Sequence, residues 1–186
     1  MNSFRVFVIS FVIILFASCG EDVTIKPAAK LRLQYEVPNY ESFSVNCPYS
    51  FEKNTHSKVK LNQDCNLNLE YTRMKATVYL TYQKVNDNIE ALLADAQKLT
   101  YDHTVKANEI FEQPRVDSIN KVYGMFYMIN GDAATQSQFY VTDSINHFIS
   151  GALYFESKPN FDSIYPAVVY LRNDIRRIME TIDWKN

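Results

Sequence analysis

Glycine is scarce in this 186-residue chain. The four glycines are Gly20, Gly124, Gly131 and Gly151, and they lie far apart along the sequence. A dinucleotide-binding fingerprint or a phosphate-binding loop needs several glycines within one turn, because the backbone must approach the phosphates closely. The sequence therefore excludes a Rossmann-type nucleotide site and a P-loop.

Histidine is rare as well, and long basic runs are missing. His56, His103 and His147 occur singly, so no two imidazoles share a helix face at the i, i+4 spacing typical of zinc enzymes. The net charge is −2, and without a run of Lys or Arg little attracts a nucleic-acid backbone. We expect no metal site, no cofactor and no nucleic-acid partner.

Apolar and aromatic residues are plentiful by comparison. Hydrophobic residues make up 47% of the chain and aromatic residues 14%, with 13 Tyr and 12 Phe. This content is sufficient to bury the core of one domain of ordinary size.

The N-terminus has the pattern of a signal peptide. Arg5 precedes a run over residues 6–16 that is apolar except for Ser10, and the small residues Ala17 and Ser18 follow. The segment is shorter than the ~20 residues that a membrane-spanning helix needs. The sequence therefore predicts a signal peptide over residues 1–18 that is removed from the mature protein.

The cysteine at the end of this segment indicates lipidation. Phe16-Ala17-Ser18-Cys19 resembles a bacterial lipobox, with Phe16 where leucine is usual. Acylation of Cys19, for example with palmitate, would anchor the protein to the cell envelope, and we expect the outer membrane, on either its periplasmic or its surface face. Residues 19–39 are then a lipidated tether and residues 40–186 a single globular domain. The alternative is an ordinary signal peptide in which Cys19 occurs by chance.

The two remaining cysteines are Cys47 and Cys65. A pair of cysteines in an exported protein favours a disulfide bond. Two free thiols, or a metal site shared with His56, are the alternatives.

Several segments of the globular part have strand patterns. Residues 42–51 are strand-like but interrupted by Pro48, and residues 67–71 alternate between apolar and polar side chains. The disulfide would join the ends of this early hairpin. Residues 75–83 show the clearest period of two, and a helix capped by Asp87 or Asn88 is expected to run to about Lys106.

An antiparallel meander and a final helix complete the prediction. Strands are expected over 121–129, 135–142 and 147–155, joined by short turns. The first of them is apolar on both sides, which predicts helices on both faces of the sheet. A helix with an apolar stripe from Ile164 to Ile182 follows. We therefore predict an α+β fold, an antiparallel sheet with helices packed on both faces, which resembles the PsbP/Mog1-like α/β/α sandwich.

Three arginines of the last helix, Arg172, Arg176 and Arg177, lie mostly off its apolar stripe. They form either a solvated helix face or an arginine-rich surface on which a partner docks. His103 lies on the apolar stripe of the preceding helix, where it is either a half-buried structural side chain or a ligand or base.

Seven segments of the chain are distinctive in their sequence: 47–52, 76–82, 95–101, 121–127, 137–144, 158–163 and 176–181. Together they resemble the GldD family of gliding motility lipoproteins of Bacteroidetes, and the resemblance covers nearly the whole chain. It implies a non-enzymatic envelope lipoprotein that is required for gliding motility and, through shared machinery, for type IX secretion. Its partners would be other envelope proteins of that machinery, and Cys19 is the only functional residue that the resemblance transfers.

Two other functions are alternatives. The aromatic residues on both sides of strand 121–129 could hold a small apolar ligand or a lipid between the sheet and a helix, although such residues also form ordinary cores. A hydrolase would need His103 with Asp95 or Asp102, or His147 with Asp143, but no local nucleophile motif accompanies them.

Overall fold

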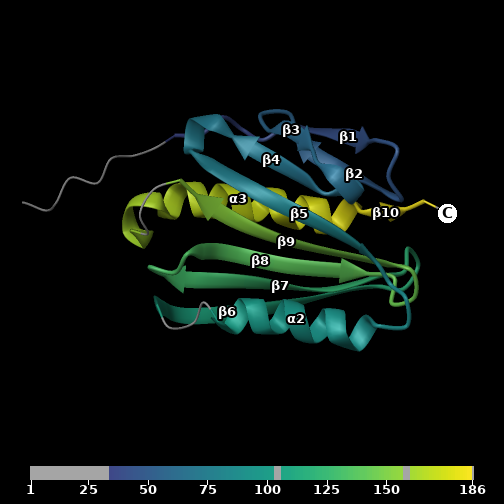
Figure 1. Ribbon diagram of the computed structural model, residues 1–186. Coiled ribbons are helices and arrows are strands. Elements are labelled where there is room, and N and C mark those ends of the chain that lie inside the picture. Colours follow the sequence, from purple (N-terminus) through teal and green to yellow (C-terminus); the bar gives the residue numbers. More distant parts are fainter. Residues whose placement is uncertain (1–33, 103–105, 157–159, 186) are drawn as a thin grey trace, which may run out of the picture. The chain divides into compact units, whose positions relative to one another are not determined.

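The computed structural model describes residues 34–102, 106–156 and 160–185, which belong to one compact unit. These residues form an α+β fold in which the sheets are antiparallel, as predicted (Figure 1). The elements are, in chain order, β1 (Tyr40–Ser44), β2 (Tyr49–Asn54), β3 (Lys58–Leu61), η1 (Gln63–Cys65), β4 (Leu67–Tyr71), η2 (Thr72–Met74), β5 (Ala76–Lys84), α2 (Ile89–Asp102), β6 (Ala107–Asp117), β7 (Val122–Gly131), β8 (Thr135–Thr142), β9 (His147–Phe155), α3 (Phe161–Thr181) and β10 (Asp183–Trp184).

The larger sheet has seven strands in the order β3-β4-β5-β9-β8-β7-β6. It contains the predicted meander β7-β8-β9, in which each strand pairs with the next. The period of two in β5 is confirmed, because Ala76, Val78 and Leu80 are buried while the residues between them are more exposed. The alternation of apolar and polar residues in the sequence therefore predicted β5 correctly.

A second sheet of three strands has the order β1-β2-β10. The predicted strand over residues 42–51 is divided into β1 and β2, and Pro48 lies in the connection between them. The last strand, β10, pairs with β2 through Asp183 and Trp184. The first and the last strand of the described chain therefore lie on either side of β2 in this small sheet.

The helix α3 packs on the main core. Asn160 caps the helix by accepting a hydrogen bond from the backbone N–H of Ser163. Leu171, Ile175 and Ile178 are fully buried and belong to one apolar cluster with residues of both sheets. The apolar stripe predicted for this helix thus holds the two sheets together.

The helix α2 packs on a smaller, separate cluster. Leu92 is buried there with Val85 and with Phe148 of β9, while Leu93 and Tyr140 pack around them. The predicted coverage of both faces by helices, and the PsbP/Mog1-like arrangement, stay predictions.

The structure differs from the sequence-based prediction between α2 and β7. The predicted helix to Lys106 ends in the described chain at Asp102, and an unpredicted strand, β6, begins at Ala107. None of the eleven residues of β6 is fully buried, so it lacks the buried side that creates an alternating pattern. It forms the edge of the sheet, where Pro114 is tolerated.

Candidate functional site

Some of the predicted functional residues lie outside the described residues. These are the signal peptide 1–18, Cys19 with the first part of the tether, and His103. The end of the predicted tether is described, and Tyr35 packs its ring against Tyr170 of α3 at a centroid distance of 5.4 Å. The chain is therefore in contact with the domain before β1 begins.

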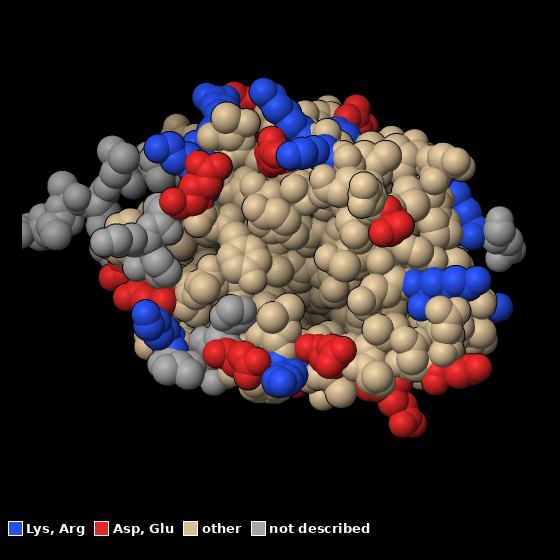
Figure 2. All heavy atoms as spheres, in the orientation of Figure 1, with Lys and Arg blue, Asp and Glu red and all other residues tan. Residues whose placement is uncertain are grey.

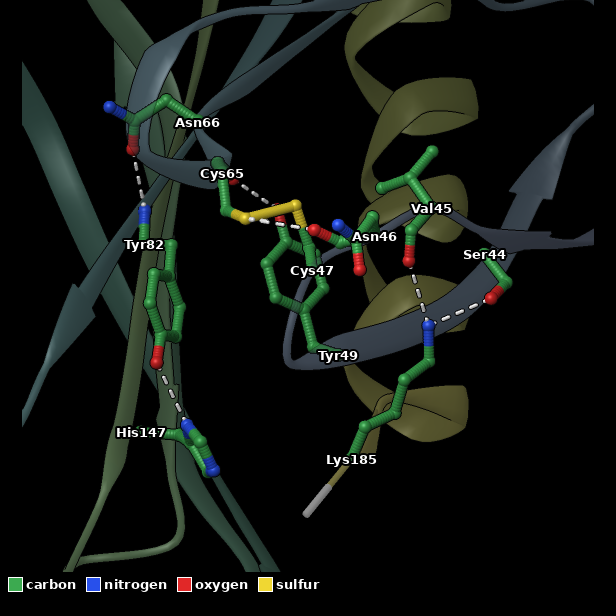
Figure 3. Close-up of a disulfide and its surroundings, with 10 residues drawn as sticks. All are labelled: Ser44, Val45, Asn46, Cys47, Tyr49, Cys65, Asn66, Tyr82, His147 and Lys185. Carbon is green, nitrogen blue, oxygen red and sulfur yellow. Dashed lines mark hydrogen bonds between the residues drawn. A yellow bond between two sulfur atoms is a disulfide. The ribbon is translucent and has the colours of Figure 1, made fainter.

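Cys47 and Cys65 form a disulfide bond (Figure 3). Cys47 lies between β1 and β2 of the small sheet, whereas Cys65 ends η1, just before β4 of the large sheet. The Tyr49 hydroxyl donates a hydrogen bond of 2.6 Å to the carbonyl oxygen of Cys65 beside it. The disulfide thus connects the two sheets. The sequence had predicted that it joins the ends of one hairpin, which is wrong.

Arg172 is buried, so its predicted role on a docking surface is wrong. Its side chain enters the core between α3 and the sheet, and burial lowers its pKa to about 10. The guanidinium donates hydrogen bonds to the carbonyl oxygens of Ile129 and Gln136, to Asn130 Oδ1 and to Ser137 Oγ. Arg172 is a structural residue that satisfies acceptors at the ends of β7 and β8.

Arg176 and Arg177 are half-buried and remain accessible in part. The Arg176 guanidinium lies 5.1 Å above the ring of Phe126 and donates to Gln113 Oε1 of β6. Arg177 pairs with Glu52 of β2 at 2.5 Å. The two side chains therefore extend toward different sheets, and a role in docking stays a prediction for both.

Asp174, a residue that the sequence analysis did not select, accepts hydrogen bonds at the junction of α3 and the small sheet. Tyr40 donates a hydrogen bond of 2.8 Å to Oδ1, and Asn54 donates one of 2.9 Å to Oδ2. Burial raises the pKa of Asp174, and these hydrogen bonds oppose the rise. Burial also raises the pKa of Tyr71, and the nearby Asp174 carboxylate adds to this effect.

A cavity of about 430 Å³ lies beside this junction, with Tyr71 and Tyr170 in its wall. Glu36 closes one side through an ion pair with Arg73 and a hydrogen bond of 2.7 Å to His56 Nε2. Hydrogen bonds from these two partners lower the pKa of Glu36. The end of the predicted tether is thus held against the domain by charged contacts at the surface.

A groove of about 200 Å³ separates α2 from the face of the large sheet. Figure 2 shows the surface hollowed between the helix and the strands, and the atoms around the hollow belong to residues other than Lys, Arg, Asp or Glu. It is lined by Tyr79, Thr81, Ala96, Leu99, Thr100, Tyr127, Gln138, Phe139, Tyr140, Ser150, Gly151, Ala152 and Tyr154. The groove is therefore aromatic and uncharged.

The floor of the groove contains a buried polar pair. The Thr100 hydroxyl of α2 lies 2.7 Å from Gln138 Oε1 of β8, and both residues are at least 97% buried, with exposed fractions of 1% and 3%. Among the residues that the structure describes, the Gln138 side-chain nitrogen Nε2 has no hydrogen-bond acceptor. A buried donor without a partner favours the binding of a ligand or water molecule whose oxygen can accept its hydrogen bond.

The histidines in the described residues occupy structural positions. His147 Nδ1 is 2.9 Å from the Tyr82 hydroxyl, and the ring stacks on Trp184. Asp143, the partner considered for a hydrolase, accepts the backbone N–H groups of residues 145–147 and so shapes the turn before β9. In the described ranges, three or more His, Cys, Asp or Glu side chains nowhere gather as a metal site.

Membrane-spanning helices are not found among residues 34–102, 106–156 and 160–185, because neither helix is both long and apolar enough.

Comparison with known proteins gives one family. The chain matches the family model described as gliding motility lipoprotein GldD over residues 20–184. A search of curated proteins and a search of solved structures return no match.

Proposed function

This chain belongs to the GldD family of gliding motility lipoproteins, and from this premise we propose that it is a non-enzymatic envelope component that assembles or stabilises the gliding and type IX secretion machinery. The match to the family carries the proposal, because it spans the domain and begins at Gly20, directly after Cys19. That starting point agrees with a mature protein whose first residue is the acylated cysteine.

The anchor explains how such a component acts. One acyl chain binds a membrane only marginally, whereas two or more hold a protein there stably. An acylated Cys19 at the start of a tether would confine the domain to the membrane surface. Confinement raises its effective concentration beside other membrane proteins, so weak contacts are sufficient for assembly.

The contacts of the domain support a structural rather than a catalytic role. The charged side chains of α3 that are buried, Arg172 and Asp174, are bound to neighbouring elements and hold the helix against both sheets. Arg176 and Arg177 of the same helix keep part of their surface exposed. We place the docking surface for other envelope proteins of the machinery at these two arginines, because arginine is enriched in protein interfaces.

Replacing the lipidated residue tests the proposal. The change Cys19→Ala, introduced into a gliding strain without its own copy, should abolish palmitate labelling, release the domain from membranes and stop colony spreading. Ser18→Ala is the matched control, because it changes the neighbouring residue and keeps the cysteine. A Cys19→Ala strain that spreads normally with a soluble protein would contradict the proposal.

The docking surface needs a separate test. Charge reversal by Arg176→Glu and Arg177→Glu should remove crosslinks to other envelope proteins while the protein stays membrane-bound. Lys98→Glu on the exposed face of α2 is the control for a general charge effect. Crosslinks that persist in the double variant would place the partner elsewhere.

A second candidate function is the binding of a small ligand or lipid between the sheet and α2. The groove of about 200 Å³ favours it, because Tyr127 and Tyr140 line this space and do not fill it. A site of this size fits one ring-sized group, since a cavity of about 150 Å³ is enough for benzene.

A further inference from the structure

We propose that the groove between α2 and the large sheet binds a neutral sugar unit, such as one hexose or N-acetylhexosamine of a glycan. The inference rests on the second candidate function, ligand binding in this groove, and specifies the chemistry of the ligand. It follows from three properties of the lining: it is uncharged, it combines aromatic rings with hydroxyl groups, and it contains a buried amide that needs an acceptor.

Because its lining is uncharged, the groove favours neutral ligands over charged ones. The described residues that line the groove include no Lys, Arg, Asp or Glu. A phosphate or carboxylate placed there would lose its hydration without gaining a counter-charge, which is costly. The ligand is therefore neutral.

Two pairs of tyrosines provide apolar ring surfaces in the lining of the groove. Tyr79 and Tyr154 meet edge to face with centroids 5.8 Å apart, and Tyr127 and Tyr140 lie with centroids 6.5 Å apart. Between these side chains the floor is low, because Ala152 is small. The C–H face of a sugar ring packs against such aromatic surfaces, and the small floor leaves room for its thickness.

The polar groups in the groove decide between a sugar and an apolar chain. Thr81 and Ser150 contribute hydroxyl groups to the lining, and Gln138 contributes its side-chain amide. An acyl chain would remove water from these groups and offer no hydrogen bond in return, at a cost for each group. The hydroxyl groups and acetamido carbonyl of a sugar replace that water.

Gln138 is the anchor of the proposed site. Thr100 holds the amide oxygen, and this bond directs Nε2, which lacks an acceptor in the described part of the chain, away from the helix hydroxyl. A carbonyl or hydroxyl oxygen of the ligand that reaches the floor would accept this hydrogen bond. Thr100 also lies 3.0 Å from the Ala96 carbonyl oxygen, so its hydroxyl stays satisfied when Gln138 is replaced.

The test uses the full chain in phosphatidylcholine nanodiscs with ¹³C-labelled alanine methyl groups. Ala96 and Ala152 line the groove, whereas Ala94 is exposed on α2 and does not line it. The sugar probes are methyl N-acetyl-β-D-glucosaminide and methyl β-D-glucoside, and decanol is the apolar probe. The sugars should shift the Ala96 and Ala152 signals and leave the Ala94 signal in place.

Two variants locate the sugar. Gln138→Met keeps the length of the side chain but removes the donor, and should weaken sugar binding about five- to tenfold. Ala152→Leu fills the floor and should abolish the shift at Ala96. Ala94→Leu adds the same volume outside the groove and should bind as the unmodified chain does, and urea unfolding shows that each variant is folded.

The outcomes distinguish sugar binding from ligand binding in general. If decanol shifts the groove methyls and the sugars do not, the sugar inference is overturned and ligand binding stands. If no probe shifts them, ligand binding in this groove fails as well. Sugar binding that is unchanged in both Gln138→Met and Ala152→Leu would overturn the proposed location.

Discussion

The hydroxyl of Tyr40 donates a hydrogen bond of 2.8 Å to Oδ1 of Asp174, although the two residues are 134 positions apart in the sequence. The bond joins the first strand of the small sheet to the last helix. Because the carboxyl is buried and its pKa is raised, this contact also makes the stability of the junction depend on pH.

We expect ionisation of the Asp174 carboxyl to lower the free energy of unfolding as the pH rises. A carboxyl whose pKa is higher in the folded chain than its ordinary value of 3.8 binds its proton more tightly when folded. The free energy of unfolding therefore falls as the pH rises from the ordinary value through the raised one. Urea unfolding between pH 4 and 8 should show this slope in the unmodified chain relative to Asp174→Asn, which cannot titrate.

Tyr40→Phe is the control for this pH dependence. The Tyr40 hydrogen bond lowers the pKa of Asp174, so its removal should move the falling interval to higher pH. A difference between the unmodified chain and Asp174→Asn that stays constant across the pH range would contradict the assignment.

Arg172→Met is expected to destabilise the domain by about 3 kcal/mol. The change leaves the carbonyl oxygens of Ile129 and Gln136 buried without their donor, which is more costly than losing an exposed contact. Arg177→Met removes a partly exposed ion pair with Glu52 and should cost less than about 1 kcal/mol. Chemical denaturation of both variants measures the difference, and equal losses would be inconsistent with a structural role that is specific to Arg172.

Loss of the disulfide is expected to cost about 3 kcal/mol of stability. Cys47 and Cys65 are separated by 18 positions, and closing a loop of that length restricts the unfolded chain. The double change Cys47→Ser and Cys65→Ser should lower the free energy of unfolding by this amount. Reductant should have the same effect on the unmodified chain and none on the double variant; a reductant effect on both would point to another cause.

Gly151→Ala tests the close packing beneath the groove. A Cβ at this position would lie 2.2 Å from the Phe139 ring, so the ring has to move. We expect a loss of about 1–3 kcal/mol in thermal or urea unfolding, in the range of overpacked cores. Adding Phe139→Leu should recover part of the loss, and a double variant that is simply additive would show that the ring is not the obstacle.

The sequence predicted the strands that have a clear apolar pattern and missed those that do not. β5 was found because its buried side chains recur with a period of two, and the meander because its strands are apolar and joined by short turns. β6 was missed because none of its residues is buried and most are exposed, so that only pairing with β7 makes it a strand. The second sheet was missed for another reason: β10 has two residues and pairs with a strand far away in the sequence.

Helix spacing would have placed Arg172 and Asp174 correctly. Arg172 follows Val168 by four positions and precedes Ile175 by three, so it belongs to the buried stripe of α3. Asp174 follows Leu171 by three and precedes Ile178 by four. Charge alone suggested a solvated face, whereas their positions predict burial. For the Thr100–Gln138 pair no comparable spacing exists, because it depends on how α2 packs on the sheet.

The position of β2 has a consequence for how the chain folds. β2 pairs with its neighbour β1, but its other partners, α3 and β10, are the last elements to be made. Contacts over such sequence separations form slowly, because the intervening chain must first be ordered. In the export that we propose, the paired strands β1 and β2 would emerge before α3 and β10. The small sheet would then be completed only when the C-terminus arrives, which suits a protein that is exported before it folds.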